Sequence, residues 1–262
     1  MSVLGNNLLA QYYAQNQGQA DVILVISTAS QLTWGFRLFH YTLNDSSIIE
    51  WGDGTKETLT PGSYTYGTVF THTYLNAGEY TVKLKAGKSG IKYFRINANT
   101  GNTFSDSFGY CAMVSRIVKM DGLAKAFGEA NNSTFYDCKN AVFPSKLPES
   151  AVRFNNYPFG NCLKLNISEL PEQTEYIGNG AFYNSGVSIS EIPEGVTDVG
   201  SYALRSLNLV NITFKGKPTT INANAFLGCT NLTLIRVPWS EGEVANAPRG
   251  ATNATIIYNY QS

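Results

Sequence analysis

A seven-residue motif that recurs every 22 residues constrains the fold of this chain more than any other feature of its sequence. Its copies are Tyr176-Ile-Gly-Asn-Gly-Ala-Phe182, Asp198-Val-Gly-Ser-Tyr-Ala-Leu204 and Thr220-Ile-Asn-Ala-Asn-Ala-Phe226. Further back, phenylalanine fills the last motif position at the wider spacings of 23, 24 and 27 residues, in Phe159, Phe135 and Phe108. Such a period is typical of a solenoid, in which each coil buries its apolar face only by stacking on its neighbours. The sequence therefore predicts six stacked coils.

The four cysteines follow the same register, because each lies three residues after a repeat phenylalanine. They are Cys111, Cys138, Cys162 and Cys229. In the two other coils this position falls on Ser185 and Leu207. A position that accepts Cys, Ser or Leu indicates a small interior slot, where cysteine acts as a compact apolar residue. We therefore expect reduced, buried thiols rather than the two disulfides that an even cysteine count also allows.

Each coil then runs through apolar residues to a strand that ends near a proline. These ends are Leu147-Pro148, Leu170-Pro171, Ile192-Pro193 and Val237-Pro238. The unit Ala-Phe-x-x-Cys-x-x-Leu, Ile-Pro and Val-x-x-Ile-Gly resembles the BspA-type leucine-rich repeat of bacterial surface proteins and phage tail proteins. The coils of Phe108 and Phe135, with residues 113–128 between them, depart from the consensus. We expect a solenoid over residues 99–238 and a C-terminal cap over residues 239–262, with a closing strand at 254–258.

The part of the chain before the repeat predicts a β-sandwich over residues 21–98. Short runs of alternating apolar and polar residues are separated by turn residues, as in sandwich domains. In the clearest run, Tyr80, Val82 and Leu84 are expected to face the core. The expected strands are 22–26, 32–39, 48–51, 69–74, 80–84 and 91–96. This domain is expected to cap one end of the solenoid.

Three ordered motifs in this domain carry a second family resemblance. They are Trp51-Gly-Asp-Gly-Thr55, His72-Thr-Tyr74 and Gly78-Glu-Tyr-Thr-Val-Lys-Leu84. Together they resemble the PKD type of immunoglobulin-like domain, which implies a seven-strand sandwich used as a spacer or adhesion module. The chain departs from the family pattern in that Trp51 directly abuts the Gly-Asp-Gly turn. The fold class expected is mostly β, a PKD/Ig-like β-sandwich followed by a short leucine-rich-repeat solenoid.

Neither domain offers a constellation of residues that could run a reaction or hold a metal or cofactor. Asp53 is expected to form a turn, because one carboxylate supplies too few oxygen ligands for calcium. His72, which only His40 accompanies in the chain, is expected to be a packed strand residue rather than a base or a metal ligand. The sequons at Asn211 and Asn231 are expected to be turn and ladder residues. The expected protein is not an enzyme and carries no cofactor.

The charge of the chain disfavours partners that are recruited by charge. Nineteen basic residues balance nineteen acidic ones, and only 15% of the chain is charged. Binding to nucleic acid or to an anionic membrane surface needs a basic excess that this chain lacks. No run of residues is long and apolar enough for membrane insertion. The expected partners are therefore proteins or glycans.

One surface position per coil is the candidate binding surface. The residue after each repeat phenylalanine varies in type, so it is expected to be exposed, in a row along one edge of the solenoid. Its occupants are Gly109, Tyr136, Gly160, Tyr183, Arg205 and Leu227. Tyr and Arg dominate binding hot spots. Tyr136, Tyr183 and Arg205 are the predicted binding residues.

These features favour an attachment protein with two working ends. Residues 1–20 form an N-terminal arm with apolar residues at helical spacing and without a secretion signal, so we expect docking onto other virion proteins or onto copies of the chain as a homo-oligomer. The solenoid is expected to contact a host-surface glycan or protein. The leading hypothesis is a non-catalytic phage virion protein, a tail fibre or decoration protein. A bacterial cell-surface adhesin is the alternative, and a glycan-degrading tail enzyme would need clustered carboxylates that the spacing does not offer.

Overall fold

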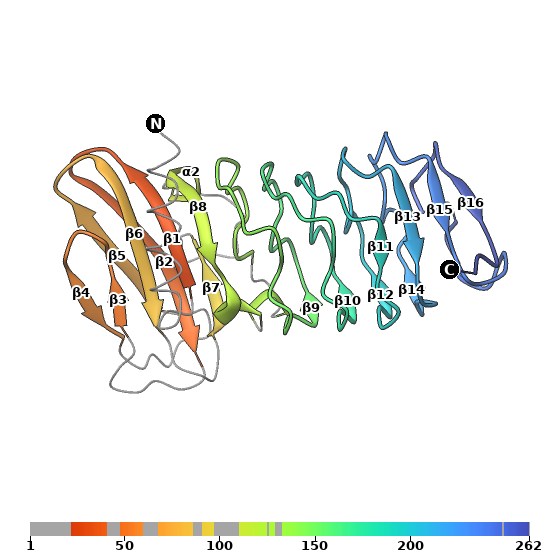
Figure 1. The fold of residues 1–262 in the computed structure, drawn as a ribbon, viewed down its shortest axis with the longest axis horizontal. Helices are drawn as coiled ribbons and strands as arrows, with labels where there is room; N and C mark the ends of the chain where they lie inside the picture. The colour runs from red at the N-terminus through yellow and green to blue at the C-terminus, as the bar shows by residue number, and fades with distance from the viewer. Residues whose placement is uncertain are drawn as a thin grey trace, which may run out of the picture.

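The computed structural model describes residues 22–40, 48–59, 68–85, 91–96, 110–124, 126–128, 133–247 and 249–261. A β-sandwich and a solenoid lie end to end along the long axis of the molecule (Figure 1). The solenoid coils stack along this axis and continue away from the sandwich. Within the described ranges, no helix is long and apolar enough to cross a membrane.

The sandwich consists of two antiparallel sheets. One has the order β4-β3-β6-β1-β8, with β4 at Lys56–Thr58, β3 at Ile48–Glu50, β6 at Gly78–Lys85, β1 at Val22–Thr28 and β8 at Val114–Lys119. The other has the order β5-β2-β7, with β5 at Thr68–Tyr74, β2 at Leu32–His40 and β7 at Ile91–Arg95. All six predicted strands are present. Sequence reasoning missed β4, which is short and exposed on every residue.

Aromatic side chains from both sheets fill the sandwich core. Trp34 and Phe36 of β2 meet Trp51 at ring-centroid distances of 6.4 and 5.9 Å. Val82 and Leu84 of β6 are buried, which confirms the predicted alternation of that strand. The Tyr74 hydroxyl donates to the Trp51 carbonyl oxygen at 2.8 Å, so the strand that carries the His-Thr-Tyr motif is tied to the Gly-Asp-Gly turn.

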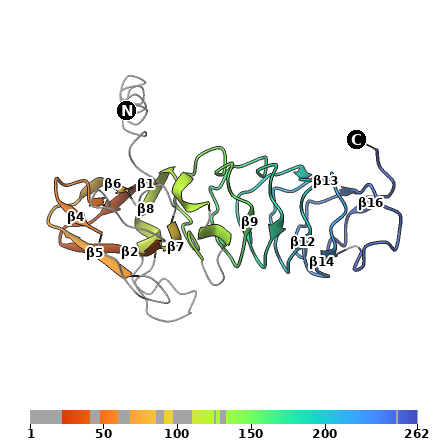
Figure 2. The same cartoon turned by 90° about the horizontal axis from the view of Figure 1, so that it is seen from below.

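Strand β8 joins the sandwich to the solenoid. One edge of β8 pairs antiparallel with β1, and the other forms a parallel bridge to the first coils, between Arg116 and Val142. The Ile117 amide donates to the Val142 carbonyl oxygen at 2.8 Å, and the Val142 amide donates to Ser115 at 3.0 Å. The sandwich therefore caps the solenoid through backbone hydrogen bonds of β8, which lies between β1 and the first coils in Figures 1 and 2. Strand β8 belongs to both units, so the structure does not divide them at a single residue. The predicted boundary between sandwich and solenoid at residues 98–99 stays a prediction.

The regular coils form two short parallel sheets. The first has the order β14-β12-β10-β9, with β9 at Arg153–Phe154, β10 at Tyr176–Ile177, β12 at Asp198–Val199 and β14 at Thr220–Ile221. The second has the order β11-β13-β15-β16, with β11 at Glu191–Ile192, β13 at Asn211–Phe214, β15 at Leu234–Arg236 and β16 at Thr255–Ile257. Tyr176, Asp198 and Thr220 pair in direct register, which confirms the 22-residue repeat. Strand β16 is the predicted closing strand.

Three short helical segments precede the regular coils. They are α2 at Tyr110–Met113, η2 at Asp121–Leu123 and η3 at Ala126–Gly128. Phe127 of η3 is buried and stacks on Phe154 at 5.9 Å, so the irregular start of the repeat contributes to the same core as the later coils.

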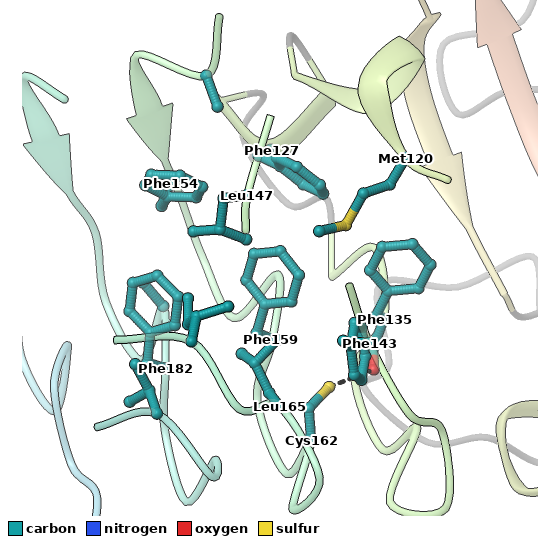
Figure 3. Close-up of a cluster of buried hydrophobic side chains, with 14 of the residues drawn as sticks. Met120, Phe127, Phe135, Phe143, Leu147, Phe154, Phe159, Cys162, Leu165 and Phe182 are labelled. Carbon is teal, nitrogen blue, oxygen red and sulfur yellow. Dashed lines mark hydrogen bonds between the residues drawn. The ribbon is translucent and has the colours of Figure 1, made fainter. Parts of the chain in front are cut away.

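The repeat phenylalanines form a buried column through the solenoid. Phe135, Phe159, Phe182, Phe226 and the equivalent Leu204 have no exposed surface. Phe159 and Phe182 stack almost parallel, with centroids 5.6 Å apart and an interplanar angle of 3° (Figure 3). The predicted first member of the column, Phe108, lies outside the described residues.

The four cysteines are free and buried, as the sequence predicts. The Cys162 thiol donates to the carbonyl oxygen of Phe135 in the preceding coil at 3.1 Å (Figure 3), and the Cys229 thiol donates to Leu204 at 3.1 Å. Burial raises the pKa of both thiols, which keeps them protonated and unreactive. The cysteine column therefore adds inter-coil hydrogen bonds to the apolar core.

The prediction that Leu207 fills the cysteine slot is wrong. Leu207 is 57% exposed, whereas Ser206 is buried and donates to the carbonyl oxygens of Ser185 and Val187. The other coils place one residue with positive φ two positions after the repeat phenylalanine: Asp137, Asn161, Asn184 and Gly228. The coil of Leu204 lacks this left-handed residue, so Ser206 directly follows Arg205. The interior slot of that coil is therefore two residues after the repeat apolar residue, whereas the cysteine slots are three residues after it.

An asparagine ladder fixes the next turn in several coils. In four coils an asparagine side-chain amide donates to a backbone carbonyl oxygen of the preceding coil. The pairs are Asn140 to Ala112, Asn208 to Gly186, Asn231 to Leu207 and Asn253 to Thr230. The ladder role predicted for Asn231 is confirmed. The bond to Ala112 also places Cys111 in the same register as the later cysteines.

In the C-terminal cap, Arg249 lies at the position that an interior alanine occupies in the coils before it. Ala181, Ala203 and Ala225 are buried and precede the repeat apolar residue, and their carbonyl oxygens accept hydrogen bonds from the previous coil. Arg249 accepts the equivalent bond from Phe226, and its buried guanidinium lies 5.8 Å from the Trp239 ring. A long side chain thereby covers the last coil, where no further phenylalanine follows.

Truncation of the phenylalanine column is expected to destabilise the whole array. Phe182→Ala should lower the free energy of unfolding by about 3 to 5 kcal/mol, because it removes a buried ring and leaves a cavity. Leu207→Ala is the matched control, with an expected change within about 0.5 kcal/mol, because the side chain is exposed. Chemical denaturation measures both. Equal losses in the two variants would contradict the register described above.

Candidate binding surface

The structure brings the three predicted binding residues together and adds two that sequence reasoning missed. Tyr136, Tyr183 and Arg205 line one shallow pocket of about 410 Å³ with Tyr157 and Tyr202. All five side chains are partly exposed. We call these five residues the tyrosine strip.

The rings of the tyrosine strip follow one another in a zigzag across four consecutive coils. Tyr136 meets Tyr157 at a centroid distance of 6.0 Å, Tyr157 meets Tyr183 at 5.9 Å, and Tyr183 meets Tyr202 at 6.1 Å. The interplanar angles of 68° to 87° make every contact edge-to-face, an arrangement that aromatic pairs favour. The result is a continuous ribbon of ring faces and edges along the solenoid.

The zigzag arises because tyrosine and glycine alternate at two positions of the repeat. Tyr136 and Tyr183 follow the repeat phenylalanine, whereas Tyr157 lies two residues before it. A Cβ on Gly160 would lie 2.7 Å from the Tyr136 ring, and one on Gly180 would lie 2.1 Å from the Tyr157 ring. The rings of Tyr136 and Tyr157 thus each lie over the glycine at the equivalent position of the next coil. This alternation was the signal in the sequence that could have identified Tyr157 and Tyr202.

Arg205 closes the C-terminal end of the strip. Its Nη1 donates to the Tyr183 hydroxyl at 3.0 Å, and its guanidinium carbon lies 4.8 Å from the centre of the Tyr183 ring. A Cβ on Gly228 would lie 2.8 Å from the Arg205 Nε, so the absence of a side chain there leaves room for the guanidinium. The ring and hydroxyl of Tyr183 therefore hold the arginine in place, and Gly228 leaves the space that the guanidinium occupies.

The hydroxyls of Tyr136 and Tyr157 stay protonated at ordinary pH. Burial raises the pKa of Tyr136 and of Tyr157, and neighbouring groups such as Asp137 and Tyr183 add to the rise. Neutral tyrosine hydroxyls both donate and accept hydrogen bonds. The strip thus combines apolar ring faces with neutral polar groups.

Two residues of the strip have a strained backbone. Tyr157 has φ of 55° and Tyr202 has φ of 53°, in the left-handed region that bulky residues avoid. Gly180, at the equivalent position of the intervening coil, has φ of 58° without that strain. Strain of this kind costs about 1 to 3 kcal/mol and concentrates at functional sites. The tyrosines at these positions lower stability, which is consistent with a role outside folding.

The remaining members of the predicted row contribute less. Gly160 is buried under Tyr136, and Leu227 is 37% exposed beyond Arg205. Gly109 lies outside the described residues.

A second hollow, the glutamate groove, lies at the proline-bearing turns. It has a volume of about 510 Å³ and is lined in part by Glu149, Glu169, Glu172, Glu191 and Lys215. The structure therefore gathers carboxylates that sequence spacing did not lead us to expect together. All four glutamates are exposed, and Glu191 forms an ion pair with Lys215 at 2.8 Å. The general acid of a glycosidase is kept protonated by burial, and these side chains lack that burial.

In the sandwich, Asp53 and His72 form a hydrogen-bonded pair. The Asp53 Oδ2 lies 2.7 Å from the His72 Nε2, and Oδ1 accepts hydrogen bonds from the Thr55 amide and hydroxyl. The His72 ring stacks on Trp51 at 5.2 Å and meets Tyr74 edge-on at 4.7 Å. Asp53 thus holds its own turn, and His72 is packed in its strand, as predicted. Among the residues that the structure describes, no group of three His, Cys, Asp or Glu side chains could hold a metal ion.

A β-sandwich whose sheet continues into a solenoid of stacked coils defines a mostly β protein of two modules. Family models match both modules: the PKD domain over residues 11–89, and the BspA type Leucine rich repeat region, in six copies, over residues 128–246. The chain is a PKD domain followed by BspA-type leucine-rich repeats, a combination of surface-protein type. Modules of both kinds typically serve in binding or structure rather than catalysis. The PKD match begins inside the predicted arm.

No curated protein matches the chain. Among solved structures, the chain is similar to a leucine-rich repeat protein from Bacteroides ovatus ATCC 8483, with 25% sequence identity and a TM-score of 0.32. The match covers 47% of this chain and 35% of the other, so the chain spans about a third of the length of that protein.

The Asp53 pair predicts a specific pH dependence of stability. Burial raises the pKa of Asp53, but hydrogen bonds from Thr55 and His72 outweigh it and lower the pKa from 3.8 to about 2. A carboxyl whose pKa is lower in the folded state stabilises the fold above its unfolded pKa and loses that effect as the pH falls. The stability difference between wild type and Asp53→Asn should therefore be largest above about pH 4 and shrink toward pH 2. Denaturation at several pH values measures it, and a constant difference would contradict the pair.

Proposed function

We propose that this chain is a non-catalytic attachment protein that binds a glycan through the tyrosine strip. The observation that carries the proposal is the continuous ribbon of four half-exposed tyrosine rings that ends in a positioned arginine. Ring faces pack against the C–H faces of sugars, and tyrosine hydroxyls and arginine exchange hydrogen bonds with sugar hydroxyls. Tyrosine also loses little conformational entropy on binding, because its side chain has only two rotatable angles.

The backbone around the strip favours a sugar over an extended peptide. The amides of Tyr157, Phe159 and Phe182 donate to carbonyl oxygens of the next coil, so these groups are already used within the solenoid. A peptide that binds by adding a strand needs unpaired backbone groups. A ligand that is bound through side chains alone fits this surface, and an oligosaccharide is such a ligand.

The proposal extends to location and assembly. We place the protein on a phage virion, as a tail fibre or decoration protein, with a bacterial cell surface as the alternative. Support comes from the resemblance of the repeat and sandwich motifs to those of phage tail proteins and bacterial surface proteins, and from the low, balanced charge. Residues 1–20, which lie outside the described residues, would dock onto other virion proteins or onto copies of the chain. Capsid and tail genes beside this one would support the virion, and a cell-wall anchor in a longer natural chain would support the adhesin.

Loss of the strip should abolish glycan binding without unfolding the protein. The triple variant Tyr136→Ala, Tyr183→Ala and Arg205→Ala should weaken binding to a panel of bacterial envelope polysaccharides at least tenfold, measured by surface plasmon resonance. The matched control removes Arg153 and Tyr176, which form a similar arginine-on-tyrosine contact at 4.4 Å elsewhere on the solenoid. Equal loss in the control, or no polysaccharide bound by wild type, would overturn the proposal.

The arm is expected to serve assembly and not recognition. Deletion of residues 1–10, and separately of residues 1–19, should leave the melting temperature and glycan binding unchanged but reduce the protein to a monomer. Size-exclusion chromatography with light scattering measures the mass. The shorter deletion ends before the PKD match at residue 11, so it separates loss of assembly from damage to the sandwich. A truncated chain that still assembles would contradict this role.

A further inference from the structure

We propose that the ligand of the tyrosine strip is an acidic oligosaccharide, whose carboxylate is bound by Arg205. This inference rests on the proposed function and adds the chemical class of the ligand. The observation behind it is a positioned arginine for which no carboxylate partner lies within ion-pair distance in the part of the chain that the structure describes.

Three lysines of the solenoid have carboxylate partners. Lys139 pairs with Asp137 at 3.6 Å, Lys215 with Glu191 at 2.8 Å and Lys217 with Glu243 at 3.5 Å. Hydrogen bonds from Thr220 and Thr197 lower the pKa of Asp198, and the charge of Arg153, which stacks on Tyr176, adds to that effect. Arg205 contacts neutral groups, the hydroxyl and ring of Tyr183. Arg236 and Arg249 also lie over aromatic rings, but of these three arginines only Arg205 lines the tyrosine strip.

The geometry leaves part of the guanidinium available to a ligand. Arginine carries five N–H donors in a fixed plane, and the Nη1 atom provides the bond to Tyr183. The remaining donors suit the two oxygens of a carboxylate, which bind such a fork through two parallel hydrogen bonds. Because the residue is half-buried, a charge pair formed here is stronger than one in open water.

The carboxylate would lie at one end of the site and the sugar rings along the tyrosines. From the coil of Tyr136 to the coil of Arg205 the strip spans three coil steps, about 14 Å at the usual strand spacing. This length suits a short oligosaccharide with an acidic residue at the Arg205 end. Uronic and sialic acids share the carboxylate and are the two sources to distinguish.

The test compares acidic glycans with the same glycans after their carboxyl groups are reduced to alcohols. The panel contains uronate-bearing and sialylated oligosaccharides and a proline-rich peptide, and binding to the full chain is measured by calorimetry. We expect at least one acidic glycan to bind, with affinity at least tenfold lower after carboxyl reduction and lower at high salt. The class that binds identifies the source of the carboxylate.

Variants assign the effect to Arg205. Arg205→Gln should remove the preference for the acidic form, whereas Arg205→Lys should keep part of it, because lysine retains the charge but not the planar fork. Arg153→Gln is the control and should change neither affinity nor preference. Unchanged melting temperatures show that each variant folds.

The possible failures are distinct. If the reduced glycans bind as tightly as the acidic ones, the carboxylate inference is wrong and the glycan function stands. If the proline-rich peptide alone binds, or no glycan in either form binds, both the inference and the proposed function are wrong.

Discussion

The stacking of coils on a preformed strand is the interaction on which the rest of the structure depends. A single coil offers only short strands, such as the two-residue Arg153–Phe154, so it cannot hold its apolar face in the absence of a neighbour. Strand β8 supplies the first neighbour, because one of its edges is fixed by β1 and the other accepts Val142. The sandwich thus acts as a template for the array, in addition to any role as a spacer.

Stacking also separates the residues that fold the solenoid from those that can vary. The phenylalanine and cysteine columns point inward and are fixed by packing and by inter-coil bonds such as the one from Cys162 to Phe135. The positions on either side point outward and carry Tyr136, Tyr157 or glycine. A repeat of this kind can build a ligand surface by changing outward residues without altering its core. The strained φ of Tyr157 shows that such a change has a cost in stability.

Length changes within a coil are tolerated where the backbone turns. The coil of Leu204 omits the left-handed residue, and Ser206 then takes the interior slot with a hydrogen bond to each of two carbonyl oxygens. Arg205, which directly precedes the omission, lies next to the ring of Tyr183 at the end of the strip. The irregular coil therefore contributes to the candidate site.

The sequence alone determined the solenoid, its period and its interior, because burial of a residue type at a fixed phase depends on a local pattern that recurs. It also determined six of the sandwich strands and the two families, but not the short exposed strand β4. Only the tertiary structure decided that Leu207 faces solvent, that Tyr157 and Tyr202 complete the strip, and that the exposed glutamates share a groove. These outcomes depend on how neighbouring coils align in space. A one-residue difference in a turn changes that alignment, and the turn carries no apolar pattern from which the change could be predicted.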